Sequence, residues 1–359
     1  MNPKYVDVVN WIKDQIEAKK LLPGQKLYSE NELCQKFGMS RQTVRHALDI
    51  LEEEDIVTRV RGSGTYINGT RQSVQDNRKV IAFITTYVDG YIFPKIMQGI
   101  EKKLFDNGFS IQIAFTNNRF DRECEVLKEF LNRNEIAGVI AETTKSNLPN
   151  PNLWLYQEMI KKGIPVLFIN SYFPGVAIPH VSINDKSAGK KATSYLIEKG
   201  HKKIGGIFKL DDGQGRDRYA GYLEAMQEAK LLCEDGHVLW LDTIDVKHPE
   251  SCRQRILDRF ADCTAICCYN DEIAFSLVEI FSQEGIRVPE DISIVSIDNS
   301  ELAILGDVAL TSVNHPKNIL GEKAAENILA MIRSASFDGN YEFDENIVER
   351  DSVKSIGNI

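Results

Sequence analysis

The sequence has no hydrophobic run long enough to span a bilayer, and its first residues do not resemble a signal peptide. Its seven cysteines, an odd number, are scattered without CxxC pairs or Cys/His metal spacing. These absences argue against a disulfide framework and against a zinc site. We expect a cytoplasmic protein with reduced thiols that holds no metal and no cofactor and has no membrane partner.

The signatures of common enzyme classes are missing as well. There is no nucleophile-elbow motif, no glycine-rich phosphate-binding loop and no zinc-binding spacing. His201, His237 and His248 stand apart, without the spacing that would gather them on one face of a helix or strand. The sequence therefore predicts that the protein is not an enzyme.

An excess of basic residues is also absent, since 43 Lys and Arg face 52 Asp and Glu, for a net charge of −9. The charge is unevenly distributed along the chain. Residues 1–70 hold ten residues of each sign, residues 71–79 carry a net charge of +2, and residues 80–359 carry −11. A nucleic-acid site would therefore depend on the local field of one face near the N-terminus, because the net charge of the chain opposes it.

The stretch from residue 23 to residue 67 predicts two short helices and a hairpin. Ser29-Glu30-Asn31-Glu32 is a capping box, and Gly38 ends the first helix. Ser40 can cap the second helix, whose apolar residues recur at helical spacing. These residues are Val44, Ala47, Leu48 and Leu51. A second helix that is polar and basic in its first turns is typical of a helix-turn-helix, where it enters the major groove of DNA.

The hairpin completes this unit. Residues 57–60 are predicted to form a strand, whose side chains alternate between its two faces. Residues 61–64 form a glycine-rich turn, and residues 65–67 form the returning strand. Such a tip can approach phosphates closely, while Arg59 or Arg61 reaches the minor groove. Upstream, Tyr5, Val8, Val9, Ile12 and Ile16 form one stripe of a first helix. The whole unit is predicted to be a winged helix.

These residues resemble the heads of GntR-type bacterial repressors. The resemblance rests on Pro-Gly-Gln-Lys-Leu-Tyr-Ser-Glu at 23–30, Ser-Arg-Gln-Thr-Val-Arg at 40–45 and Gly-Ser-Gly-Thr at 62–65, and it covers about residues 3–67. It implies a domain that binds double-stranded DNA. The residues that the resemblance places in contact with DNA are Lys4, Glu30, Arg41, Gln42, Thr43, Arg45, Arg61 and Gly62.

Residues 69–79 are polar, lack apolar periodicity and predict a linker between a domain of residues 1–68 and one of residues 80–359. In the second domain, apolar runs alternate with helical segments near 94–107 and 122–132. The predicted strands are 80–85, 110–115, 138–141, 166–169, 203–208, 265–269 and 292–297. This rhythm predicts an α/β fold with parallel sheets covered on both faces, in two lobes with a cleft between them.

Ligands of open α/β sheets bind beyond the carboxyl ends of the strands, so polar residues directly after strands are candidates. These residues are Tyr87, Asp89, Tyr91, Glu142, Asn170, Arg218, Asn270, Asp271 and Asp298. Aromatic faces together with acids, amides and an arginine suit a polyhydroxylated small molecule, whose hydroxyls need partners when buried.

Plainer interpretations of several of these residues stay open. Asp271 and Asp185 can be helix caps. Arg218 can be a structural salt-bridge partner, and Tyr87 and Tyr91 can pack one lobe against the other.

A second resemblance is to LacI-type sugar-sensing regulators, whose body has the fold of periplasmic binding proteins. It rests on residues 288–299, 310–313 and 321–329 and spans roughly residues 79–335. This family commonly has Asp where Asn170 stands. The effector-binding residues that follow from this resemblance and from the strand ends are Tyr91, Glu142, Asn170, Arg218, Asn270, Asp298 and His315.

A GntR-type head on a LacI-type body resembles one family of repressors of Gram-positive bacteria, whose effector is L-arabinose. Residues 142–146, 205–212 and 268–274 add to this likeness. It implies a homodimer that binds operator DNA and is released by the sugar; spacing alone does not separate a pentose from a hexose. The alternatives are another sugar, an activator, a transport binding protein, or an enzyme fused to the same head.

Overall fold

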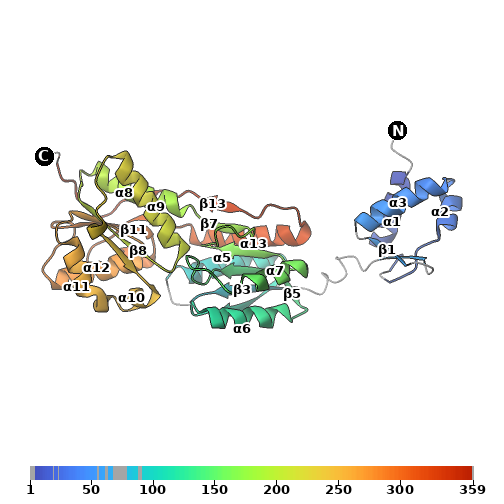
Figure 1. Cartoon of the computed structure of the whole chain (residues 1–359), viewed down its shortest axis with the longest axis horizontal. Helices are drawn as coiled ribbons and strands as arrows, with labels where there is room; N and C mark the ends of the chain where they lie inside the picture. The colour runs from blue at the N-terminus through green and yellow to red at the C-terminus, as the bar shows by residue number, and fades with distance from the viewer. Residues whose placement is uncertain are drawn as a thin grey trace. The chain divides into compact units, whose positions relative to one another are not determined.

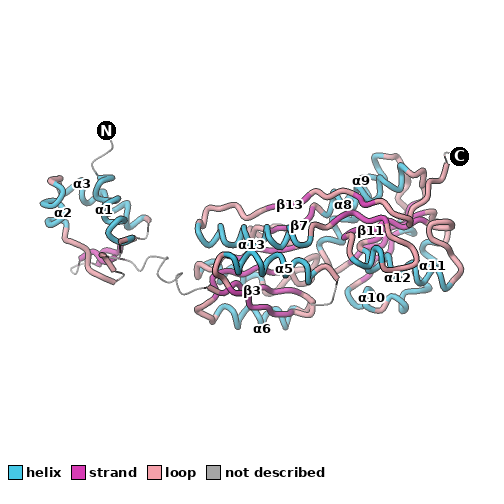
Figure 2. Tube along the Cα trace, turned by 180° about the vertical axis from the view of Figure 1, so that it is seen from behind, coloured by secondary structure: helices cyan, strands magenta, loops and turns pink. Residues whose placement is uncertain are grey.

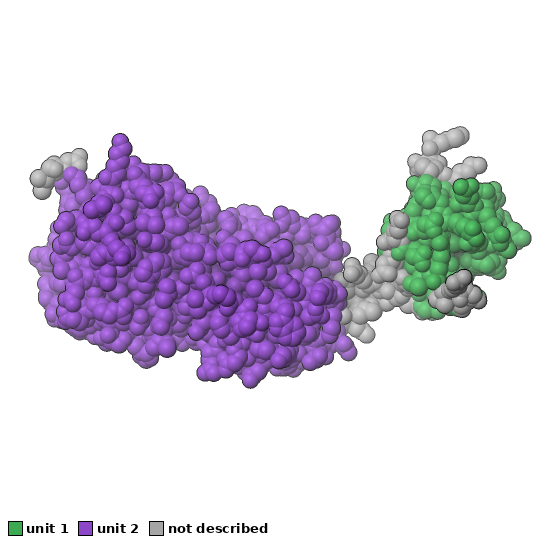
Figure 3. All heavy atoms as spheres, viewed as in Figure 1, with its two compact units in different colours: residues 1–79 green, residues 80–359 purple. Residues whose placement is uncertain are grey.

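The computed structural model describes residues 5–18, 20–22, 24–54, 56–60, 64–67, 79–87 and 91–357. The chain divides into two compact units, Met1–Lys79 and Val80–Ile359 (Figure 3). Buried apolar side chains form one cluster in the first unit and three in the second. Each unit therefore has a hydrophobic core of its own. The predicted linker, apart from Lys79, lies outside the described residues.

The first unit has the predicted winged-helix elements. They are α1 (Tyr5–Glu17), α2 (Glu30–Phe37), α3 (Arg41–Glu53), β1 (Val57–Val60) and β2 (Gly64–Ile67). Both hydrogen bonds of the Ser29 capping box are present, and Gly38 ends α2 with φ of 62°. The Ser40 hydroxyl accepts the Thr43 N–H at the start of α3. β1 pairs antiparallel with β2, and Leu33 and Val44 are fully buried in the core beneath.

The second unit has two lobes, and the first is built on a six-stranded parallel sheet in the order β13-β7-β6-β5-β3-β4. The strands are β3 (Val80–Thr85), β4 (Ser110–Phe115), β5 (Ile136–Glu142), β6 (Val166–Ile169), β7 (His180–Ile183) and β13 (Tyr341–Phe343). The helices are α5 (Phe93–Asp106), α6 (Phe120–Leu131), α7 (Leu153–Lys161) and α13 (Lys317–Arg333).

Alternate residues of the interior strand β3, which lies between β5 and β4, face opposite sides of this sheet. Ile81 and Phe83 belong to the core that includes residues of α5 and α13, whereas Ala82 and Ile84 belong to the core beneath α6 and α7. Figures 1 and 2 both show α5 and α13 side by side, and the two helices pack against each other. A strand buried on both faces has the continuous apolar sequence seen here.

The second lobe contains a six-stranded sheet in the order β14-β12-β11-β10-β8-β9. Its strands are β8 (Ile204–Lys209), β9 (Val238–Leu241), β10 (Ala265–Cys268), β11 (Ser293–Asp298), β12 (Thr311–Asn314) and β14 (Ile347–Val348). Its helices are α8 (Asp185–Glu198), α9 (Gly213–Glu228), α10 (Thr243–Lys247), α11 (Arg253–Phe260), α12 (Asp271–Gln283) and the short η1 (Asp235–His237), η2 (Pro249–Cys252) and η3 (Glu301–Ile304). The chain passes between the lobes at residue 184, at residues 315–316 and at residues 344–346.

The sequence predicted β3, β4 and β6 with their observed bounds, but it missed β7, β9, β12, β13 and β14. These five strands have two to four residues each, and β12 is largely polar, so they lack a long apolar run. β14 runs antiparallel to β12, so one edge of this sheet departs from the parallel order that the strand-helix rhythm predicted. Among the helices described, none combines the length and the apolar character needed to cross a membrane.

Candidate functional site

A cavity of about 90 Å³ lies between the two lobes of the second unit, beyond the carboxyl ends of the strands. Five of the predicted effector-binding residues line it, namely Tyr91, Glu142, Asn170, Asn270 and Asp298. Arg218 and His315, also predicted, are buried with 1% and 2% of their surface exposed. The fold thus gathers the predicted set around one cleft; Asp89 lies outside the described residues.

Glu142 ends β5, and its carboxylate accepts hydrogen bonds from Thr85 and Thr86 of the first lobe. Its Oε2 accepts the Thr85 hydroxyl at 2.7 Å, the Thr86 N–H at 2.6 Å and the Thr86 hydroxyl at 2.8 Å. Burial raises the pKa of Glu142 to about 7, against these hydrogen bonds, which lower it. Near neutral pH the group can therefore either donate or accept a hydrogen bond from a ligand hydroxyl.

Lys209, Asp212 and Tyr269 face the cavity from the second lobe and were missed as site residues. The Tyr269 hydroxyl donates to Asp212 Oδ2 at 2.8 Å, and Lys209 Nζ lies 3.5 Å from the same oxygen. Burial lowers the pKa of Lys209, but the nearby carboxylates, above all Asp212, outweigh it and raise the pKa. Lys209 ends β8 and Tyr269 follows β10, so the strand-end rule already contained the signal that would have found them.

Arg218, on α9, is the centre of a buried charge cluster. Its Nε donates to Asp185 at 2.8 Å, its Nη2 to Asp298 at 3.1 Å and its Nη1 to the Tyr269 carbonyl at 2.6 Å. The interpretation as a salt-bridge partner is therefore right, and the same bonds orient Asp298 in the cavity wall.

The Arg218 guanidinium pairs with two buried carboxylates, Asp185 and Asp298, and the pKa values of these two groups shift in opposite directions. Burial raises the pKa of Asp185 to about 7. Burial also acts on Asp298, but Arg218, with help from His315, outweighs it and lowers the pKa. Asp298 is thus the carboxylate held as an anion beside the cavity.

Tyr91 connects the lobes. Its hydroxyl donates to Asp298 Oδ2 at 2.7 Å and accepts the Asp271 N–H at 3.2 Å. Lys247 Nζ lies 3.4 Å from the centroid of the Tyr87 ring, so the second tyrosine also contacts the other lobe. The predicted packing role of both tyrosines is compatible with their place in the cavity lining.

Two of the predicted effector-binding residues, Asn170 and His315, have buried polar side-chain atoms without a hydrogen-bond partner among the described residues. Asn170, 2% exposed and with φ of 63°, leaves both Oδ1 and Nδ2 unpaired. His315, in the segment that passes between the lobes, leaves both ring nitrogens unpaired, and burial lowers its pKa to about 4, so it is neutral. An unpaired buried polar group costs about 1–3 kcal/mol, which a ligand can recover by supplying the partner.

The capping interpretation of Asp271 and Asp185 is wrong, because their neighbours make the caps. Asn270 accepts the Ile273 N–H, and Asn184 accepts the Ser187 N–H. Asp271 instead accepts the Ser296 and Ser312 hydroxyls at 2.5 and 2.7 Å. The Asn270 oxygen is thus engaged in its helix, and its amide nitrogen is the group left to face the cavity.

A larger hollow of about 640 Å³ lies elsewhere on the second lobe, between α12 and residues 306–310. Its wall contains none of the described residues with unpaired buried polar atoms, so the smaller cleft between the lobes is the better ligand site.

In the first unit, the polar face of α3 carries the predicted DNA contacts. Arg41, Gln42 and Arg45 are exposed in its first turns. Glu30, at the start of α2, accepts Arg45 Nε with both oxygens at 3.0 and 3.1 Å, and lies 3.8 Å from Arg41 Nε. Thr43 Oγ1 lies 2.9 Å from the Ser40 hydroxyl. Glu30 therefore positions two arginines on the polar face of α3.

Arg59, one of two candidates for the minor groove, is engaged elsewhere. Its Nη1 donates to Asp49 at 2.6 Å, and its N–H donates to Glu52, so it joins the hairpin to α3. Arg61 is left as the candidate. Arg61, Gly62 and Lys4 lie outside the described residues.

Comparison with known proteins agrees with this two-part architecture. The model of bacterial regulatory proteins of the gntR family matches residues 4–67, and that of the periplasmic binding protein-like domain matches residues 193–353. The chain is 36% identical over 359 residues to the arabinose metabolism transcriptional repressor of Geobacillus stearothermophilus, over 99% of this chain and 98% of that protein. The chain belongs to the family of arabinose metabolism transcriptional repressors.

A second member of this family, from Halalkalibacterium halodurans, is 36% identical over 360 residues, which cover 97% of this chain and 94% of the relative. The predicted pairing of a GntR-type head with a LacI-type body is confirmed. As a member of a repressor family, the chain is a sugar-responsive DNA-binding regulator, and the alternatives of an enzyme and of a transport protein are set aside.

Solved structures agree on the fold of the body. The complex of the transcriptional regulator CelR with cellobiose superposes with a TM-score of 0.68 at 22% identity, over 87% of this chain and 90% of that one. The regulator CcpA of Lactococcus lactis superposes with a TM-score of 0.69 at 24% identity, over 77% of this chain and 99% of that one. At these identities the likeness concerns the fold alone.

Proposed function

We propose that L-arabinose is the effector, that it binds in the cleft between the lobes, and that it releases the repressor from double-stranded operator DNA. The observation that carries this proposal is Asn170, which is buried in the cavity wall and whose side-chain oxygen and nitrogen are both unpaired among the residues that the structure describes. The choice of arabinose rests on the two relatives, which are arabinose metabolism transcriptional repressors.

The chemistry of the cleft suits a small polyol. Glu142 offers a carboxyl group near its midpoint of ionisation, and Asp298 offers an anion held by Arg218. The rings of Tyr91 and Tyr269 add apolar faces to the lining. A cavity of about 90 Å³ favours a single small ring over an oligosaccharide.

Operator recognition is assigned to the exposed polar face of α3. We propose that Arg41, Gln42, Thr43 and Arg45 contact bases or phosphates, as in other recognition helices, with Glu30 beside them. Lys4, Arg61 and Gly62 are proposed on the resemblance alone. A hundredfold loss of operator affinity on sugar binding requires about 2.7 kcal/mol of difference in sugar affinity between the two states.

We also propose that the repressor is a homodimer, because two-fold symmetry would pair two heads with two half-sites. Exposed apolar side chains on both lobes support this: Ile304 and Leu305 are 65% and 70% exposed, and Ile319 is 60% exposed. The Lys95–Glu301 ion pair, 2.9 Å long, joins α5 of the first lobe to η3 of the second. Sedimentation equilibrium of the full chain measures the molecular mass, which distinguishes a monomer from a dimer.

Calorimetric titration with L-arabinose, and with D-xylose, D-galactose and D-ribose as comparisons, tests the effector. Selective arabinose binding that is lost in Asn170→Ala, but kept in the exposed Asn132→Ala, is the expected result. Fluorescence anisotropy on labelled operator then measures release at saturating arabinose. Selective binding of a different sugar would show that this sugar, and not L-arabinose, is the effector. If the bound sugar strengthens operator binding, the protein requires the sugar to bind DNA and is not released by it.

A further inference from the structure

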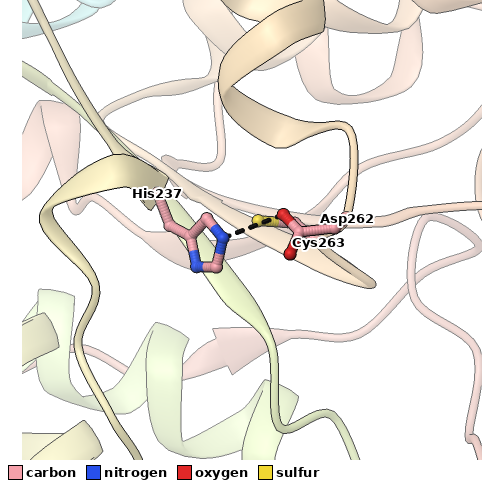
Figure 4. Close-up of side chains that lie close together, drawn as sticks. All are labelled: His237, Asp262 and Cys263. Carbon is pink, nitrogen blue, oxygen red and sulfur yellow. Dashed lines mark hydrogen bonds and ion pairs between the residues drawn. The ribbon is translucent and has the colours of Figure 1, made fainter.

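A second cluster of ligand-type side chains lies in the second lobe, away from the cleft. His237 ends η1 just before β9, and Asp262 and Cys263 come just before β10 (Figure 4). β8 separates β9 from β10 in the sheet, and the three strands are parallel. The cluster therefore lies at the edge where the strands begin, opposite the edge that faces the effector cleft.

The ligand atoms of this cluster are close together. One nitrogen of His237, one oxygen of Asp262 and the Cys263 sulfur all lie within 4.8 Å of one another. His237 Nε2 is 2.9 Å from Asp262 Oδ1, the contact dashed in Figure 4, and 3.9 Å from Glu234 Oε2. A nitrogen, a sulfur and carboxylate oxygens thus converge from two loops that are 25 residues apart in the chain.

Burial divides the cluster into a dry and a wet side. His237 and Cys263 are 8% and 7% exposed, whereas the Asp262 side chain is 56% exposed. The Cys263 sulfur lies over Gly205 of β8, where a Cβ atom would come within 3.3 Å of it and within 2.5 Å of the Phe260 ring. The bare backbone at Gly205 makes the room in which the thiol sits.

We propose that His237, Asp262 and Cys263 bind a divalent transition-metal ion of the zinc type. Imidazole, thiolate and carboxylate are the protein ligands that Zn²⁺ takes, in tetrahedral geometry with bonds of about 2.0–2.3 Å. Glu234 or a water molecule supplies the fourth ligand. On binding, Cys263 coordinates as the thiolate, its proton passes to water, and the imidazole carries its remaining proton on Nδ1.

The side chains have only small movements to make. Bonds of this length set neighbouring ligand atoms about 3.4 Å apart in a tetrahedron. The His237–Asp262 contact must widen from 2.9 Å, and the wider separations, up to 4.8 Å, must shorten. Rotation of the exposed Asp262 side chain adjusts its distances to the other two ligand atoms, and small rotations of His237 and Cys263 adjust the distance between these two side chains.

The positive charge of Lys203 disfavours binding of a metal ion at this site, so a substitution of Lys203 provides a further test. Its Nζ lies 2.9 Å from Asp262 Oδ2, while Oδ1 is turned to His237. The Lys203 side chain is 56% exposed, so it can swing into solvent when a cation arrives. Because its charge repels the ion, Lys203→Gln should bind the metal more tightly than the unmodified chain.

The test uses the full chain without an affinity tag and titrates it with Co²⁺, then displaces the Co²⁺ with Zn²⁺. We expect one tight Co²⁺ per chain and a thiolate-to-cobalt absorption band in the near ultraviolet. Cys263→Ser should abolish the band, His237→Ala should weaken binding at least tenfold, and Lys203→Gln should strengthen it. Cys252→Ser, which removes another buried thiol of the same lobe, should leave the titration unchanged.

Sugar binding by each variant reports whether the lobe has folded. If Cys263→Ser does not fold, Asp262→Asn is used in its place, and the readout is the melting temperature with and without Zn²⁺. We expect Zn²⁺ to raise the melting temperature of the unmodified chain but not that of Asp262→Asn. A chain that shows no band at saturating Co²⁺ overturns the proposal. So does a band that survives Cys263→Ser or a Co²⁺ affinity that His237→Ala leaves unchanged.

Discussion

At the scale of single residues, the cleft contains groups that the fold holds in unfavourable states. The buried side chains of Asn170 and His315 have polar atoms that find no partner in the described part of the chain. Asp298 has φ of 106°, a left-handed conformation that costs a non-glycine residue about 1–3 kcal/mol. Glu142 is kept partly protonated near pH 7. Such groups lower the stability of the free protein, and a ligand that pairs with them regains the free energy.

Glu142 predicts a pH dependence of stability. Its pKa rises from 4.5 to about 7 on folding, so below about pH 4.5 the carboxyl is protonated in both states. As the pH rises from 4.5 to 7, the unfolded chain loses this proton first, and the free energy of unfolding falls until the folded group has also ionised. Glu142→Gln does not titrate. Its melting temperature relative to the unmodified chain should therefore rise between pH 5 and pH 8, by roughly 2–4 °C for each kcal/mol.

Differential scanning calorimetry at several pH values measures this difference. Glu198→Gln, which changes an exposed glutamate at the end of α8, is the matched control and should give a constant difference. A constant difference for Glu142→Gln as well would mean that the folded protein does not raise the pKa of this group.

At the scale of helices and strands, glycine pairs set the packing of both lobes. A methyl group on Gly99 of α5 would overlap the Asn318 carbonyl, and one on Gly321 of α13 would overlap the Ile96 carbonyl. The same reciprocal contact recurs between Gly189 of α8 and Gly221 of α9. The backbones of these helix pairs therefore touch directly, which places each pair at a fixed distance across its sheet.

Gly99→Ala should destabilise the protein, although the change favours an isolated helix by up to about 1 kcal/mol. The added methyl group has to push α13 away from α5, at a cost of about 1–3 kcal/mol. Urea unfolding measures the loss. Gly236→Ala is the control, because a Cβ atom there meets no atom of the described residues within 4 Å. Equal stability of Gly99→Ala and the unmodified chain would contradict the close approach of the two helices.

At the scale of the whole molecule, the chain separates two tasks into two units with separate cores. The acidic residues are concentrated in the body, with a net charge of −11 over residues 80–359, while the head is neutral and presents its arginines on α3. Binding to DNA and binding to sugar are therefore expected to respond to different substitutions.

Arg45→Ala should weaken operator binding by about 1–3 kcal/mol and leave the sugar affinity unchanged. Arg45 is 61% exposed on α3, so its loss removes a DNA contact without disturbing a core. Anisotropy on operator DNA and calorimetry with arabinose give the two affinities. Lys13→Ala, which removes an exposed ion pair with Glu54, is the comparison and should change neither. A parallel loss of sugar binding in Arg45→Ala would show that the two tasks are not divided in this way.

Local sequence was enough to establish the head and most of the parallel strands. The Ser29 capping box, Gly38 and the Ser40 cap act through neighbours within four residues, so they can be recognised without knowledge of the fold. The strand-end rule likewise selected Tyr91, Glu142, Asn170, Asn270 and Asp298, which all line the cavity.

The packing of the two lobes established the rest. Arg218 meets Asp185 and Asp298, 33 and 80 residues away, and His237 meets Asp262 and Cys263 at the opposite edge of the same sheet. No residue spacing in the sequence predicts these two clusters, because their members come from strands and connecting segments that are distant in the chain and become neighbours only in the folded protein. Capping and turn chemistry act along the chain, whereas buried charge clusters and ligand sites depend on which distant surfaces exclude water together.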